Sequence, residues 1–191
     1  EDISLLLPLW AGIPNSRRAR DIITKTVLSE NRYLYQYGLV ACPFQRSSME
    51  TPICGKVNLL MSQFVLSGLL RYGYRKEAAD IFSKIMIGII QILKREHCFR
   101  ESFRADNGNP DGETNSLGGL VPIKLFLDIL GIKILRPDTI VIQDQNPFPW
   151  NVTISYRGTT IIRREKETLL NFLDGQTITI TGEGSHEIHL G

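Results

Sequence analysis

The stretch VNLLMSQFVLSGLLRYGYRKEAADIFSKIMIGIIQILKRE, residues 57–96, predicts two long helices joined by a short turn. Apolar residues recur at helical spacing on both sides of Gly73, a residue type that commonly ends helices because it adopts positive φ without strain. Ser62, Ser67 and Gly68 favour close packing on a second side of the first helix. Because so few residues separate the two helices, they are expected to form an antiparallel hairpin.

Both helices are apolar over more than one stripe, unlike a helix that lies on a protein surface. This pattern predicts a layered bundle or a ring of helices. Further helices are expected at 15–30, where Asn15 or Ser16 is a suitable N-cap, and from about Ser116 to Leu130. Residues 30–55 between the first two helical regions are rich in aromatic residues and are interpreted as a long ordered loop.

The C-terminal part of the chain alternates β-branched and polar residues, which predicts four to six short antiparallel strands. Arg157-Gly158 and Asp174-Gly175 are suitable hairpin breaks. The sequence therefore divides into a helical domain, 1–135, and an antiparallel β-module, 136–191. Trp150 is expected to pack this β-module onto the helices.

Charge and hydropathy argue against nucleic acids and membranes as partners. The formal net charge is +2 with acids and bases mixed, so no nucleic-acid partner is expected. The basic clusters at 17–20 and 163–166 are interpreted as solvated faces, with a phosphate site as the alternative. No apolar run reaches the roughly 18 residues of a membrane span, so no membrane partner is expected.

Neither a disulfide framework nor a zinc site is expected, because Cys42, Cys54 and Cys98 are odd in number and lack CxxC spacing. A reducing, cytoplasmic compartment is then the default. The three histidines do not form a metal set, and no metal or other cofactor is predicted. The chain lacks an initiator methionine and is expected to be a piece of a longer polypeptide.

The stretch CFRESFRADNGNPDGE, residues 98–113, is interpreted as a polar loop that is longer than most helix connections. It contains Glu101 between the aromatic residues Phe99 and Phe103. One interpretation is that the loop presents Glu101 to a ligand. The other is that Glu101 is a loop carboxylate paired with Arg100 or Arg104, whose charges would lower its pKa.

Short motifs of this chain occur in a characteristic order: a GKVN helix start, an RYGY turn, a Phe-x-Glu-x-Phe segment and a polar Asn/Gly/Pro/Asp loop. The residues that carry them are Gly55, Val57, Asn58, Leu70, Tyr72, Gly73, Phe99, Glu101, Phe103, Asn107, Gly108, Asn109 and Gly112. This order resembles the C-terminal end of the (α/α)6-barrel glycoside hydrolases, which include trehalase-like, glucosidase-like and glycogen-debranching-like enzymes. The resemblance implies an α+β fold, with helical hairpins of an incomplete (α/α)6 toroid followed by the β-module.

The same resemblance implies hydrolysis of α-linked sugars by inversion, with Glu101 as the general base. An oligosaccharide or glycoside would be the substrate. The predicted substrate-binding residues are Trp10, Phe99, Phe103, Asn58 and Asn107.

Inverting hydrolysis also needs a carboxylic acid on the other side of the scissile bond. No acidic residue of the chain is convincing in that role, so the chain alone is expected to be inactive. The alternative is a non-catalytic carbohydrate-binding or protein-interaction domain that has lost the stacking tryptophans of the family. Self-association through uncovered helix faces is a further expectation.

Overall fold

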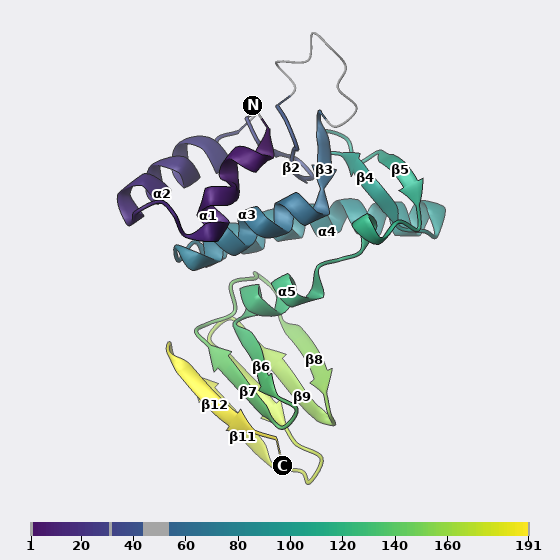
Figure 1. The fold of residues 1–191 in the computed structure, drawn as a ribbon. Coiled ribbons are helices and arrows are strands. Elements are labelled where there is room, and N and C mark those ends of the chain that lie inside the picture. The colour runs from purple at the N-terminus through teal and green to yellow at the C-terminus, as the bar shows by residue number, and fades with distance from the viewer. Residues whose placement is uncertain (1, 31, 44–53, 191) are drawn as a thin grey trace. The chain divides into compact units, whose positions relative to one another are not determined.

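The computed structural model describes residues 2–30, 32–43 and 54–190, so residues 44–53 of the predicted aromatic loop lie outside the description. The chain divides into two compact units, Glu1–Leu125 and Phe126–Gly191 (Figure 1). This division falls between residues 125 and 126, whereas the boundary predicted from the sequence lies after residue 135. Helix α5 (Ile123–Leu130) leads through Gly131 directly into β6 (Ile132–Arg136), and most of this helix belongs to the second unit.

The helices of the first unit include the two long ones that the sequence predicts. The helical elements are η1 (Ile3–Leu6), α1 (Leu7–Ala11), α2 (Ser16–Ile22), η2 (Ile23–Val27), α3 (Leu59–Arg71), α4 (Arg75–Glu96) and η4 (Leu117–Gly119). Gly73 has a φ of 84° between α3 and α4, as expected of a residue that ends a helix. Asn15 is the N-cap of α2, where its side chain accepts a hydrogen bond from the Arg18 amide.

Helix α3 packs closely against α1 at Gly68. A Cβ atom at this position would lie 2.8 Å from Cβ of Leu9 and 2.9 Å from the Trp10 backbone nitrogen. No larger side chain fits without a backbone shift. The prediction that small residues of this helix mark a close contact is therefore confirmed at Gly68.

The strands of the first unit form two small antiparallel sheets. They are β1 (Leu34–Tyr35), β2 (Gly38–Leu39), β3 (Lys56–Asn58), β4 (Arg100–Arg104) and β5 (Pro110–Thr114). The larger sheet has the order β3-β4-β5. Val57 of β3 lies opposite Phe103 of β4, and both are almost fully buried. The Phe103 ring lies over Gly88 of α4, where a Cβ atom would be 2.7 Å from it.

The predicted incomplete (α/α)6 toroid is wrong. The described residues hold one pair of long helices, α3 and α4, together with four antiparallel sheets, and they show no series of helical hairpins. The stretch 98–113 is also not a loop, because most of it forms the β4–β5 hairpin. Apolar faces that the prediction assigned to neighbouring hairpins are instead covered by short elements, with α1 packed on α3 and Phe103 of β4 packed on α4.

The second unit contains two antiparallel sheets, with α5 at one end of the strands (Figure 1). The sheet orders are β11-β10-β9-β8 and β12-β7-β6. Beyond β6, the strands are β7 (Thr139–Gln143), β8 (Val152–Tyr156), β9 (Thr159–Arg163), β10 (Glu167–Asn171), β11 (Thr177–Thr181) and β12 (Ser185–His189). Six strands, β7 to β12, lie within 136–191, where four to six were predicted, and β6 precedes them. Arg157 and Gly158 both have positive φ in the β8–β9 turn, as the predicted hairpin break requires.

Arg163 is the largest fully buried side chain of the second unit, with 1% of its surface exposed. Strand β9 buries every second residue, and Arg163 follows Ile161 in the inward-facing row. Its guanidinium donates to the carbonyl oxygens of Leu130, Gln143 and Asp144 and to Oγ1 of Thr168, at 2.7–3.1 Å. The interpretation of 163–166 as a solvated face is therefore wrong at Arg163, because the pattern of the strand places this residue in the core.

The segment between β7 and β8 is held by Asn146, which is buried. Its Nδ2 donates to the carbonyl oxygens of Trp150 and Arg163, and its Oδ1 accepts from the Phe148 amide. The Trp150 ring lies 5.4 Å from Phe148, whose ring lies 5.7 Å from Phe126 of α5. Trp150 therefore packs against residues of the second unit, to which it belongs, and 51% of its surface is exposed.

No helix of the described residues has the length and apolar character needed to cross a membrane.

Candidate functional site

A cavity of about 500 Å³ lies in the first unit, within the size range of small-molecule sites. Four parts of the chain line it: 2–4, Ala41, 56–61 and 101–112. Glu101 and Asp2 contribute carboxylates, and Lys56 contributes an ammonium group. Ile3, Ala41 and Met61 contribute apolar surface. The cavity therefore has mixed polar and apolar walls.

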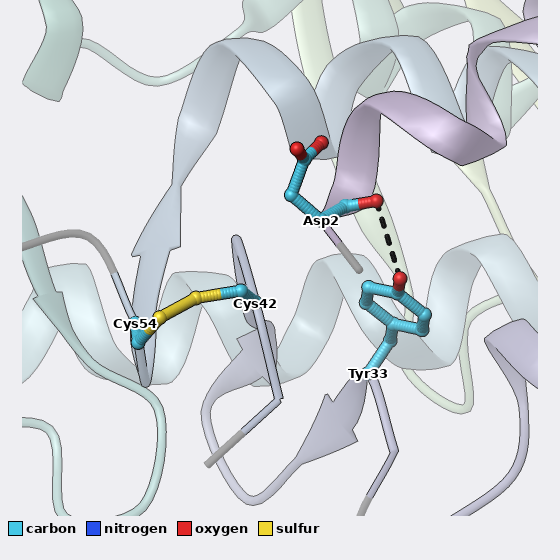
Figure 2. Close-up of a disulfide and its surroundings, with 4 residues drawn as sticks. All are labelled: Asp2, Tyr33, Cys42 and Cys54. Carbon is cyan, nitrogen blue, oxygen red and sulfur yellow. Dashed lines mark hydrogen bonds between the residues drawn. A yellow bond between two sulfur atoms is a disulfide. The ribbon is translucent and has the colours of Figure 1, made fainter. Parts of the chain in front are cut away.

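The N-terminal wall is fastened to the strands by backbone hydrogen bonds. Ile3 donates its amide to the Ala41 carbonyl at 2.7 Å, and Ala41 donates its own amide to the Lys56 carbonyl at 2.9 Å. The Tyr33 hydroxyl donates to the Asp2 carbonyl at 3.2 Å (Figure 2). Asp2 in turn caps η1, because its Oδ1 accepts from the Ser4 amide at 2.7 Å. These bonds hold the Asp2 backbone at the edge of the cavity.

A disulfide joins Cys42 to Cys54 beside this wall, with the two Cα atoms 4.7 Å apart (Figure 2). The expectation of unpaired cysteines is wrong for these two, while Cys98 is free. The pairing follows from the antiparallel bridge between Val40 and Val57, which brings distant parts of the sequence together. The prediction of a reducing, cytoplasmic compartment rested on unpaired cysteines, and the disulfide removes that basis.

Removing the disulfide should lower the free energy of unfolding. The cysteines are 12 residues apart, and closing a loop of this size stabilises a protein by about 3 kcal/mol. We therefore expect the Cys42→Ser/Cys54→Ser variant to unfold at lower denaturant concentration, with a loss of about 2–3 kcal/mol. The matched control is Cys98→Ser, which removes a thiol but no crosslink. Equal midpoints for the double variant and this control would contradict the prediction.

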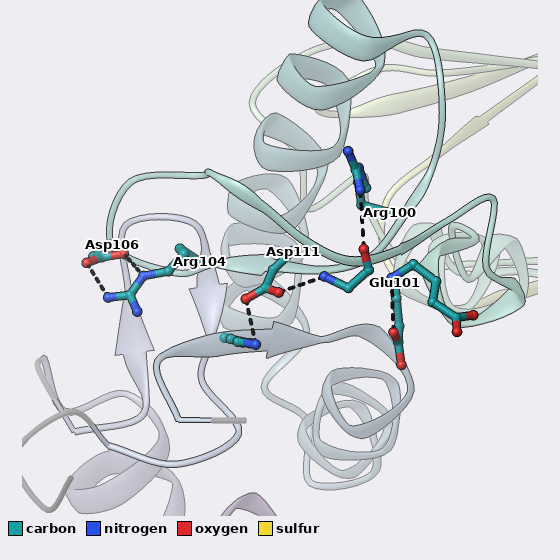
Figure 3. A network of polar contacts seen from close by, with 8 residues as sticks. Arg100, Glu101, Arg104, Asp106 and Asp111 are labelled. Atoms are coloured by element: carbon teal, nitrogen blue, oxygen red, sulfur yellow. Dashed lines mark hydrogen bonds and ion pairs between the residues drawn. The ribbon is translucent and has the colours of Figure 1, made fainter. Parts of the chain in front are cut away.

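Glu101 occupies an irregular position in the β4–β5 hairpin (Figure 3) and is among the residues that line the cavity. Arg100 pairs with Thr114 and Ser102 pairs with Asp111, so two residues of β5, Gly112 and Glu113, lie opposite Glu101. This is a β-bulge with its glycine at a φ of 72°. The Glu113 amide donates to Oε2 of Glu101 at 3.3 Å. Bulges of this kind change the direction of a side chain and often lie next to active sites.

The two arginines that flank Glu101 pair with other acids, and Figure 3 shows Arg104 beside Asp106. Arg100 pairs with Glu96 at 2.8 Å, and this hydrogen bond raises the pKa of Arg100. Arg104 pairs with Asp106 at 3.0 Å, and lowers the pKa of that carboxyl. In the described part of the chain, the Glu113 amide is the one hydrogen-bond partner of the Glu101 side chain. The interpretation of Glu101 as the ion-pair partner of its neighbours is therefore not supported.

Gly112 should be necessary for this placement of Glu101. An added Cβ would lie 2.6 Å from Oε2 and 2.8 Å from Cβ of Glu101, at a φ that strains other residues. We expect Gly112→Ala to lower the free energy of unfolding by about 1–3 kcal/mol and to displace the carboxylate. Chemical denaturation and the ¹³C shift of the Glu101 carboxylate measure the two effects.

Gly118→Ala is the matched control for this substitution. Its added Cβ would approach Glu101 no closer than 3.7 Å, which is an ordinary contact distance. An unchanged carboxylate shift in Gly112→Ala would show that the bulge does not position Glu101.

Two of the predicted site residues, Glu101 and Asn58, line the same cavity. Asn58 is the N-cap of α3, where its Oδ1 accepts from the Met61 amide at 3.0 Å. It lies opposite Ser102 in the β3–β4 pair, next to Glu101. The sequence motif that contains Asn58 and the motif that contains Glu101 are therefore neighbours in one sheet.

The other predicted substrate-binding residues are not among the residues that line this cavity. Phe103 is 1% exposed and packs in the core, and Phe99 is half-buried beside it. Trp10 lies on α1, with its ring 4.9 Å from that of Phe64. Asn107 lies in the β4–β5 turn and accepts a hydrogen bond from the Asn109 amide. The apolar walls expected from Phe99 and Phe103 are instead formed by the shorter side chains named above.

Sequence reasoning missed two charged residues of the cavity, Asp2 and Lys56. Lys56 lies 2.5 Å from Asp111, and this hydrogen bond lowers the pKa of the Asp111 carboxyl. Hydrogen bonds from the Ser4 hydroxyl and amide lower the pKa of Asp2. Asp2 stands in no motif, and Lys56 lies in the GKVN segment without an assigned role, so only their place in the fold identifies them. Within the described residues, no group of three or more His, Cys, Asp and Glu side chains is arranged to hold a metal ion.

No known protein-family model matches this chain, and no curated protein shows significant similarity to it.

Proposed function

We propose that this chain supplies the general base of a site that hydrolyses α-linked glycosides by inversion. The observation that carries the proposal is the position of Glu101. Glu101 lines a ligand-sized cavity, and the Glu113 amide is the one group of the described residues that its carboxylate bonds, while the neighbouring arginines are paired with other acids. The resemblance of the Phe-x-Glu-x-Phe segment to that of the (α/α)6-barrel hydrolases also favours this role, although the toroid itself is not part of the proposal.

In this mechanism Glu101 removes a proton from a water molecule as the water oxygen attacks the anomeric carbon. The glycosidic bond breaks, and a carboxylic acid on the opposite face gives its proton to the leaving oxygen. The two carboxyl groups of inverting enzymes stand roughly 6.5–9.5 Å apart, which leaves room for the water. Asn58, from the edge of the same sheet, supplies amide hydrogen-bonding groups for the sugar.

Asp2 is the other carboxyl group of the cavity, but it is unsuited to be the proton donor. The hydrogen bonds from Ser4 lower its pKa, so the carboxyl is ionised at neutral pH. A general acid needs the opposite shift, a raised pKa that keeps its proton. We therefore assign the acid to none of the described residues that line the cavity.

The stereochemistry of the first product tests the proposal. The full natural polypeptide that carries this sequence would be incubated with α-linked glycosides and followed by ¹H NMR. Inversion predicts that the β-anomer of the released sugar appears first and then mutarotates. Release of the α-anomer first would exclude the proposed role of Glu101, and absence of hydrolysis would exclude the proposed reaction.

The alternative function is carbohydrate binding without turnover. One observation favours it: among the described residues that line the cavity, none has an aromatic side chain. Sugar-binding sites commonly stack aromatic rings on the ligand, and a site without such a ring holds the reacting sugar less firmly. Saturable binding of a glycoside without release of any product would select this alternative.

A further inference from the structure

We propose that Asp2 is a specificity-determining residue of this cavity, which accepts hydrogen bonds from ligand hydroxyls and disfavours ligands that carry negative charge. This inference rests on the proposed function for the nature of the ligand. It concerns a residue to which neither the sequence motifs nor the reaction assigns a role.

The backbone around Asp2 is held in place at the edge of the cavity. The Asp2 carbonyl accepts a hydrogen bond from the Tyr33 hydroxyl. The next residue, Ile3, donates its amide to the Ala41 carbonyl. The Asp2 side chain is exposed and lines the cavity. Oδ1 accepts from the Ser4 amide at 2.7 Å. The amide and hydroxyl of Ser4 thus orient the carboxylate, whose oxygens keep further lone pairs to accept hydrogen bonds from a ligand.

A carboxylate in this position complements the donors of a sugar. Hydroxyl groups donate readily to ionised acceptors, and such bonds are shorter and stronger than those between neutral groups. Asn58 and Lys56, which lie in β3, provide hydrogen-bond donors on the other side of the cavity. Because Oδ1 of Asn58 is occupied by the Met61 amide, its Nδ2 is the group left to donate to a ligand oxygen. The cavity therefore presents an acceptor on one wall and donors on the other.

The charges around the cavity are unbalanced. Asp2 and Glu101 are both carboxylates, and Lys56 is the cation that lines the cavity with them. Lys56 is paired with Asp111 at 2.5 Å, so most of its charge is compensated. The nearby Arg100 and Arg104 are paired with Glu96 and Asp106. An anionic ligand would meet two carboxylates without a free cation of the described residues to offset them.

The experiment compares neutral and anionic ligands of the same shape. Methyl α-glycosides of glucose, mannose and galactose, and their 6-phosphates, would be titrated into the full natural polypeptide by calorimetry or NMR. We expect the preferred neutral glycoside to bind at least about tenfold more tightly than its phosphate. The negatively charged phosphate would be repelled by the carboxylates of Asp2 and Glu101. Asp2→Asn should weaken binding of the neutral glycoside several-fold and reduce the discrimination.

Asp80→Asn is the matched control, because Asp80 is an exposed acid of α4 outside the cavity. Equal or tighter binding of the phosphate overturns the inference, as does an Asp2→Asn variant with unchanged discrimination or a protein that binds none of these ligands. Selective binding of the neutral glycoside without hydrolysis would overturn the proposed reaction and leave the role of Asp2 intact.

Discussion

Replacing Glu101 with glutamine should lower the turnover of glycoside hydrolysis about a thousandfold and leave the affinity for the glycoside within a few-fold. General-base catalysis contributes about 10²- to 10⁴-fold to a reaction rate, and an amide cannot take the proton of the attacking water. The substitution keeps the size of the side chain and its ability to accept the hydrogen bond from the Glu113 amide. Turnover and binding would be measured separately, by steady-state kinetics and by titration.

The matched control is Glu113→Gln. Glu113 lies across the bulge from Glu101 and holds it through a backbone amide, which the substitution preserves. This variant should retain most of the wild-type turnover. Added azide, an anionic nucleophile that needs no base, should restore part of the rate of Glu101→Gln and yield a glycosyl azide. Parallel losses of turnover and affinity in Glu101→Gln would instead point to a structural role.

Replacing Arg163 with methionine should cost the second unit about 3 kcal/mol or more of its free energy of unfolding. The guanidinium donates to three carbonyl oxygens and to Thr168, and a buried acceptor left unsatisfied costs about 1–3 kcal/mol. Leu130 is the last residue of α5, so its carbonyl has no partner inside the helix and depends on Arg163. Lysine should restore only part of the loss, because an ammonium group lacks the planar fork that reaches several acceptors.

The neighbouring Arg164→Met is the control for the loss of a positive charge. Arg164 is exposed and paired with Glu167 at 2.6 Å, and exposed pairs of this kind contribute about 0–1 kcal/mol. Chemical denaturation would measure both variants, and amide hydrogen exchange in β7, β9 and β10 would locate the loss in the second unit. A difference of less than about 1 kcal/mol between them would show that Arg163 does not hold the core together.

The elements that sequence reasoning predicted well are those whose stabilising pattern is local. Helices α3 and α4 carry a helical repeat of apolar residues along their whole length, and Gly73 ends the first of them. Strands β9 and β10 alternate buried with half-buried residues, and the turn before β9 contains Gly158, which adopts positive φ without strain. Each of these signals acts within a few residues and needs no information about distant partners.

The sheet that positions Glu101 gave no comparable signal. Strand β4 is stabilised by β3, whose residues Lys56–Asn58 lie far upstream in the chain and form only a short extended segment. The Asn, Gly, Pro and Asp residues of 98–113 were interpreted as a long loop, but they form the turn and the bulge of a hairpin. Composition alone does not distinguish these two uses of the same residue types.

The sequence by itself determined the two long helices, the alternation of the C-terminal strands and the choice of Glu101 as the side chain of interest. The tertiary structure alone decided that Cys42 and Cys54 are bonded, that Arg163 is buried, and that Asp2 shares a cavity with Glu101. The physical reason is the range of the interactions. Helical and strand periodicity is set between neighbours in the chain, whereas a disulfide, a buried guanidinium and a cavity depend on groups that only folding brings together.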